Sequence, residues 1–148
     1  MNNNRRSIFK KLSLGVASLF GIHKLNASPA SPDSSVVYDQ NIPLFSGNRV
    51  HGSLVFIAGK GAHFDGDIKA HTAHVLDELK KELEKAGSNM NQVLKANVYL
   101  NDLKDYKAMN EVFLGKFGEL PPVRTTIAAA GGIPGDSLVE IDCIAYIK

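Results

Sequence analysis

Two stretches of this chain space their apolar residues as an amphipathic helix does, and both are predicted to be helices. The first covers residues 68–85, with Asp67 as its cap and Ala86-Gly87 as its end. The second covers residues 106–117. Such stripes more often pack into a core than bind a ligand. Their members are Val75, Leu76, Leu79 and Leu83, and then Tyr106, Met109, Val112, Phe113 and Phe117.

Short apolar or alternating runs between turn residues predict the strands. The turn Ser46-Gly47-Asn48 follows the first of these runs, and Gly59, Gly61 and Gly66 make a loop before the first helix. The order is three strands, a helix, a strand, a helix and two strands, which predicts an α+β fold with helices on one face of a mixed sheet. The predicted strands are residues 36–38, 43–45, 54–57, 93–100, 125–130 and 138–147.

Two charged residues interrupt the apolar sequence of the last two strands. Arg124 follows the Pro121-Pro122 turn, and Glu140 lies inside the closing apolar run. Charges in such sequence are costly unless they meet each other or a ligand. Spacing alone favours a buried ion pair. The other interpretation is a site in which the guanidinium binds a carboxylate and the acid moves a proton.

Several separated blocks of sequence agree, in order and spacing, with one known family. The blocks are Leu54–Gly59, Asn97–Tyr106, Met109–Phe113, Pro121–Thr126 and Leu138–Ala145. Together they resemble the RidA (YjgF) family, the small enamine and imine deaminases, from about Pro43 to Lys148.

The resemblance implies a chorismate-mutase-like homotrimer with sites in the clefts between subunits and no cofactor. The implied reaction hydrolyses 2-imino or 2-enamino acids to 2-oxo acids and ammonia. Arg124 would bind the carboxylate of a small metabolite, and Glu140 would position or activate the attacking water. Asn110 matches a family asparagine near the site, although an Asn early in a helix is as often a local backbone partner.

Two of the implied substrate-binding positions depart from the family pattern. Phe45 stands where many members carry Tyr, and Ala58, just before the implied substrate-binding Gly59, stands where they carry Ser or Thr. Both changes remove hydroxyls, and a site built for hydrogen bonding loses strongly without them. An extra glycine in Gly131-Gly132 also separates Arg124 from Glu140. The alternative function is therefore a non-catalytic trimer that binds small anions or acts as a chaperone.

Composition limits the remaining chemistry. The chain has 148 residues, 44% of them hydrophobic, and this predicts one domain with its own core. Cys143 is the single cysteine, which excludes an internal disulfide and predicts a small buried hydrophobe. His63, His71 and His74 have a spacing that can hold a metal, but exposed polar positions explain them better, so no metal is predicted.

The first 30 residues read as a targeting peptide, followed by the domain in residues 31–148. They contain five cations and no acid, which leaves a net charge of −3 for the domain and gives no support for nucleic-acid binding. Asn4–Lys10 is similar to a twin-arginine export signal, which predicts a bacterial, periplasmic protein with no stable membrane anchor after cleavage. The alternative is an amphipathic or disordered tail on a cytosolic protein.

Overall fold

The computed structural model describes residues 42–148. The predicted leader, residues 1–30, and the strand predicted at residues 36–38 lie outside the described residues and stay predictions. Within the described part, no helix is both long and apolar enough to span a bilayer.

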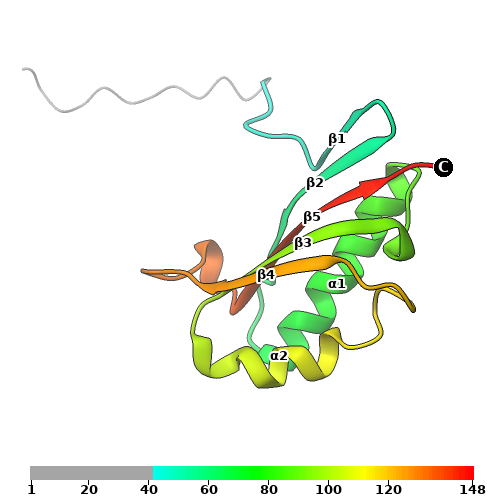
Figure 1. Ribbon diagram of the computed structural model, residues 1–148. Coiled ribbons are helices and arrows are strands. Elements are labelled where there is room, and N and C mark those ends of the chain that lie inside the picture. The colour runs from blue at the N-terminus through cyan, green and yellow to red at the C-terminus, as the bar shows by residue number, and fades with distance from the viewer. Residues whose placement is uncertain (1–41) are drawn as a thin grey trace, which may run out of the picture. The chain divides into compact units, whose positions relative to one another are not determined.

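Five strands form one mixed sheet with the order β1-β2-β5-β3-β4. Strands β3 and β4 run parallel, and the other neighbouring pairs are antiparallel. Strand β5, the last in the chain, therefore lies at the centre, and β4 forms an edge (Figure 1). The strands are β1 (Asn48–His51), β2 (Leu54–Lys60), β3 (Val93–Leu100), β4 (Val123–Ala128) and β5 (Val139–Tyr146).

Both α-helices lie on the same side of this sheet, as Figure 1 shows. Helix α1 (Ile68–Lys85) begins where the Asp67 side chain accepts a hydrogen bond from the backbone N–H of Ala70. Helix α2 (Tyr106–Phe113) packs against α1. Three short 3₁₀ turns complete the described elements: η1 (Met90–Gln92), η2 (Leu103–Asp105) and η3 (Pro134–Asp136). The predicted α+β fold is thus confirmed.

Alternation along the strands separates two faces of the sheet. In β5, Val139, Ile141 and Cys143 are buried beneath the helices, whereas Glu140 and Asp142 point to the opposite face. We call that opposite surface the helix-free face. Its exposed apolar side chains include Leu54, Phe56, Val123 and Ile127, which are 37%, 42%, 69% and 50% exposed.

Several predicted elements were wrong in their bounds. Residues 43–45 are exposed and form no strand, and β1 begins at Asn48, where a turn was predicted. Strand β4 spans Val123–Ala128 instead of residues 125–130, and β2 continues to Lys60. The second helix ends at Phe113 and not at Phe117, because the chain turns at Gly115, whose φ is +75°. Phe117 nevertheless returns to the core, with its ring 4.8 Å from that of Phe113.

Candidate functional site

Arg124 lies on edge strand β4, half-buried, with its side chain directed to the helices. Its guanidinium carbon is 4.7 Å from the centre of the Phe113 ring and 5.8 Å from that of Tyr106. Nη2 also donates a hydrogen bond to the Tyr106 hydroxyl at 3.3 Å. Stacking on aromatic faces holds the guanidinium plane while its N–H edges remain able to bind an anion.

The surroundings of Arg124 contain two further polar side chains. Asn110 is half-buried on α2, between Tyr106 and Phe113 at helical spacing. Thr126 lies two residues after Arg124 on the same face of β4, and its hydroxyl is buried without a hydrogen-bond partner among residues 42–148. A buried hydroxyl is normally paired, so this one can receive a partner from a bound molecule or a second chain.

Glu140 lies on the helix-free face, opposite Tyr99 of β3. Within the part of the chain that the structure describes, no side chain forms an ion pair or hydrogen bond with its carboxylate. The carboxyl group rests against Gly59, where a Cβ atom would be only 2.7 Å from Glu140 Cδ. The lack of a side chain at Gly59 thus leaves the space that the carboxylate occupies, and the acid is free to accept a proton.

The other predicted site residues, Phe45, Ala58 and Gly59, lie on β2 or before β1. Ala58 and Gly59 belong to an irregular stretch of β2 in which the pairing with β5 shifts between Ile57 and Lys60. Such a bulge re-aims the chain locally. Ala58 follows the buried Ile57, so its methyl group points to the helix-free face that carries Glu140. Phe45 is 73% exposed and lies before β1. Two residues later, the carbonyl oxygen of Gly47 accepts a hydrogen bond from the N–H of Ala58 at 3.0 Å.

A polar network next to Glu140 was missed by sequence reasoning. Asp142 accepts hydrogen bonds from Asn97 Nδ2 at 2.8 Å and from the Tyr99 hydroxyl at 3.0 Å. Burial, followed by the bond to Asp142, raises the pKa of Tyr99 above its ordinary value of 10.0. The alternation of Glu140 and Asp142 with buried neighbours is a signal that could have placed both acids on one face.

The two predicted catalytic residues do not meet within one chain. Arg124 pairs in register with Ala96, whose side chain is buried beneath the helices, whereas Glu140 pairs with Tyr99 on the opposite face. Strand β3 lies between their strands. The buried ion pair that spacing favoured is therefore absent from the described residues. One chain holds two half-sites: Arg124 with Asn110 and Thr126, and Glu140 with Ala58 and Gly59.

Comparison with known proteins decides the family. The family model described as Endoribonuclease L-PSP matches residues 31–147. The chain belongs to this family. A RutC family protein of Pyrococcus horikoshii is 38% identical over 122 residues, which cover 75% of this chain and 96% of that protein. The mitochondrial protein mmf2 of Schizosaccharomyces pombe is 38% identical over 102 residues, covering 64% and 80%.

Solved structures connect the Endoribonuclease L-PSP family with the predicted RidA (YjgF) family. RidA from an Antarctic Psychrobacter has a TM-score of 0.67 at 31% identity, covering 72% of this chain and 90% of that one. A YjgF family member from Neisseria meningitidis has a TM-score of 0.67 at 29% identity, with the same coverage. The chorismate-mutase-like fold is thus shown, and homotrimers are typical of this family.

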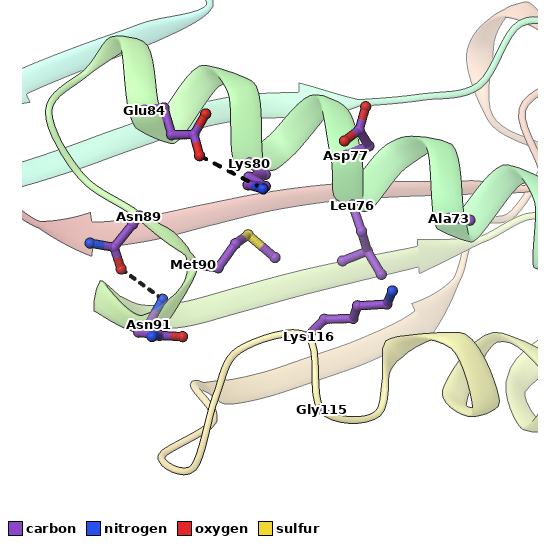
Figure 2. A pocket seen from close by; sticks show the side chains of 10 residues that line it. All are labelled: Ala73, Leu76, Asp77, Lys80, Glu84, Asn89, Met90, Asn91, Gly115 and Lys116. Carbon is purple, nitrogen blue, oxygen red and sulfur yellow. Dashed lines mark hydrogen bonds and ion pairs between the residues drawn. The ribbon is translucent and has the colours of Figure 1, made fainter.

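A hollow of about 650 Å³ lies away from both half-sites of this RidA-family chain, between α1, η1 and the turn after α2. Figure 2 shows Leu76 and Met90 inside it and charged side chains around it. Lys80 faces Glu84 at 3.9 Å, and Asp77 binds Lys81 at 2.8 Å. Ion pairs thus neutralise Asp77, Lys80 and Glu84, whereas Lys116, which also lines the hollow, forms no ion pair within residues 42–148.

Neither metal binding nor cysteine chemistry gains support. Among residues 42–148, no group of three His, Cys, Asp or Glu side chains could hold a metal ion. His71, predicted to be exposed, is 2% exposed and bonds to two loops instead. Cys143 is buried, and burial raises the pKa of its thiol to about 12, which makes it a poor nucleophile.

Proposed function

We propose that this chain hydrolyses 2-imino and 2-enamino acids to 2-oxo acids and ammonia, at a site that two copies of the chain build together. The observation that carries the proposal is the division of the site. Arg124, at a sheet edge, offers a guanidinium that aromatic rings hold and that forms no ion pair within residues 42–148. Glu140, on the other face, offers a carboxylate that no side chain of those same residues binds. Membership in the RidA family supports the reaction class.

Arg124 would bind the substrate carboxylate. A guanidinium fork matches a carboxylate through two parallel N–H···O bonds. Phe113 and Tyr106 hold its plane, so little side-chain freedom remains to be lost on binding. The Thr126 hydroxyl, buried and without a partner in the described residues, is a further donor on the same side.

Glu140 of a second copy would hold the attacking water. The imine carbon is already electrophilic, so water adds to it. Glu140 accepts a proton from the water as the new C–O bond forms and returns it to the nitrogen as the C=N double bond becomes a single bond. The remaining hydroxyl proton passes to the nitrogen through the same carboxylate, so the C–N bond breaks, the C=O bond of the 2-oxo acid forms, and ammonia leaves. No cofactor is needed for this step, because positioning of water and substrate supplies most of the rate.

Self-association is favoured by the helix-free face. Large apolar side chains there are 37% to 69% exposed, and exposed apolar side chains on one face can mark a contact with another protein chain. Within residues 42–148, strand β4, which carries Arg124, also has an unpaired edge. Both features suit the homotrimer that is typical of the family.

The test is 2-oxo acid release from freshly generated 2-iminopropanoate by the full chain. Arg124→Ala is expected to lower kcat/KM at least about a hundredfold, because the charge-assisted carboxylate contact is lost. Lys107→Ala removes an exposed cation from neighbouring α2 and should keep the wild-type rate. Equal rates for wild type and Arg124→Ala would contradict the proposal.

The second candidate is a trimer that binds small anions without turnover. Phe45 and Ala58, which lack the hydroxyls usual in the family, favour it. Titration calorimetry with small 2-oxo acids distinguishes the two, because tight binding without catalysis supports the binding function. The ribonuclease activity in the family's description is the less suitable choice here, since residues 31–148 carry a net charge of −3.

A further inference from the structure

His71 of α1 is almost fully buried, and both of its ring nitrogens bond to backbone atoms of other segments. Nε2 lies 2.8 Å from the carbonyl oxygen of Phe64, and the N–H of Leu138 donates to Nδ1 at 3.1 Å. A carbonyl only accepts and an amide N–H only donates. The ring must therefore carry its hydrogen on Nε2 and keep a lone pair on Nδ1, which requires the neutral form.

These two bonds join the loops that border the Glu140 half-site. The loop with Phe64 follows β2 and its Gly59, and Leu138 lies two residues before Glu140. The same loops are linked where Ala62 N–H donates to Ser137 Oγ at 2.9 Å. Ser137 Oγ in turn donates to the carbonyl oxygen of Val139 at 2.7 Å. The contacts of His71 thus fix the point at which β5 begins.

We propose that His71 is a pH-sensitive positioning residue for Glu140. With a proton on Nδ1, the ring nitrogen and the Leu138 amide would both be N–H donors facing each other. The hydrogen bond between them must therefore break when the ring becomes charged. Leu138 would then move, and the carboxylate of Glu140, resting on Gly59, would lose its position. The effect on activity rests on the proposed function, whereas the effect on the loop does not.

Charged and titratable groups surround His71 from each element packed against it. The first loop carries His63, Asp65 and Asp67, and η3 carries Asp136. His74, on α1 itself, contacts the other side of Phe64, whose ring is 4.8 Å from that of His71.

Asp65 and Asp136 line one hollow of about 290 Å³ with His71. Both carboxylates are exposed acceptors, to which a charged ring could donate after the loop moves. The surroundings therefore allow a second arrangement of the charged ring instead of excluding it.

The experiment follows hydrogen exchange of the Leu138 amide in the full chain, corrected for the intrinsic pH dependence of exchange. As the pH falls from about 7.5 through the range in which the ¹⁵N signals of the His71 ring show that it gains a proton, wild-type protection should fall at least about tenfold. His71→Gln keeps one acceptor and one donor but no titration in this range, so its protection should stay constant. His74→Gln is the matched control on the same helix and should behave as wild type.

Constant wild-type protection, or an equal fall in His71→Gln, would overturn the proposal. Should His71→Gln not fold, the ¹⁵N signals of the His71 ring in wild type decide. Loss of Leu138 protection must follow ring protonation, and a separation of the two events overturns the proposal.

The rate with 2-iminopropanoate is measured in parallel, and kcat should fall with the Leu138 protection while KM changes little, because Arg124 is untouched. A chain inactive at every pH would contradict the proposed function. In that case, hydrogen exchange of the Leu138 amide alone would test the effect of His71 on the loop. If the chain is active but its kcat stays constant while the Leu138 amide loses protection, the proposed link between His71 and Glu140 is overturned.

Discussion

At the scale of single residues, the position of Glu140 depends on the absence of a side chain at Gly59. The carboxyl group occupies the space that a side chain on Gly59 would fill. Gly59 is also not in the left-handed backbone region, unlike Gly52 and Gly87. Gly59 therefore matters because it leaves space for the Glu140 side chain, and not because glycine has a freer backbone.

Gly59→Ala is expected to displace the Glu140 carboxylate while the fold persists. The new Cβ would lie 2.7 Å from Glu140 Cδ, and a flexible side chain moves more readily than a strand. A misplacement of about 1 Å in a catalytic group costs about a hundredfold in rate, so kcat should fall about ten- to a hundredfold. Steady-state kinetics with 2-iminopropanoate and a thermal unfolding curve together measure both effects.

The matched control is Gly61→Ala, two residues further along. There a Cβ would be 3.4 Å from its nearest neighbours, an ordinary contact, so the rate should be retained. If Gly59→Ala also retains the wild-type kcat, Gly59 does not govern the position of the acid.

At the scale of elements, one half-buried acid, Glu82, attaches the first hairpin to α1. Glu82 Oε1 accepts a hydrogen bond from Asn48 Nδ2 of β1 at 2.6 Å, and Oε2 pairs with Lys60 of β2 at 3.2 Å. The bond from Asn48 is the largest cause that lowers the pKa of Glu82 below its ordinary value of 4.5. A depressed pKa means that the folded state favours the charged carboxylate.

Asn48→Ala is therefore expected to lower the free energy of unfolding by about 1–3 kcal/mol at neutral pH, the usual range for a hydrogen bond to a charged group. The contribution is present above pH 4.5, the ordinary pKa of Glu82, and is lost as the pH falls through its lower folded value. The difference between wild type and variant should thus shrink in acid. Urea unfolding at neutral and acidic pH measures it.

Lys85→Ala serves as the comparison, because Lys85 pairs with the other carboxylate oxygen of Glu82, Oε2, at 3.5 Å but is 69% exposed. A solvent-exposed pair contributes little, so this variant should be close to wild type. An Asn48→Ala difference that stays constant down to strongly acidic pH would show that Glu82 is not the group involved.

The elements that could be predicted from sequence are those with a long periodic pattern. Residues 68–85 and 93–100 were found with their observed bounds, because each repeats its pattern over several turns or alternations. The strand predicted at residues 43–45 was wrong, since residues 43–51 are too short and too mixed to separate a strand from a turn. The second helix was extended too far because Phe117 is buried without being helical.

The candidate site was predictable in its members but not in its geometry. Arg124 and Glu140 stand out as charges in apolar strands. Their faces depend on the register of each with β3, and no pattern within one strand reveals that register. The burial of His71 was not predicted for a similar reason, because it arises only where two distant loops meet at α1.

At the scale of the whole molecule, the division of the site predicts how mixed assemblies behave. A chain with Arg124→Ala keeps Glu140, and a chain with Glu140→Gln keeps Arg124. In a closed ring, each site takes its arginine from one copy and its acid from the next. Random mixing of the two inactive chains in equal amounts then rebuilds about one intact site in four, whatever the size of the ring.

Co-expression of the two variants should therefore restore about a quarter of the wild-type rate, although each variant alone is inactive. A site contained in one chain would give no recovery, because every copy in the mixture lacks one of the two groups. Native mass spectrometry must show that mixed assemblies form. If they do and no activity returns, the two half-sites do not meet across an interface, and the opposite-face placement of Arg124 and Glu140 would then exclude joint action on one substrate.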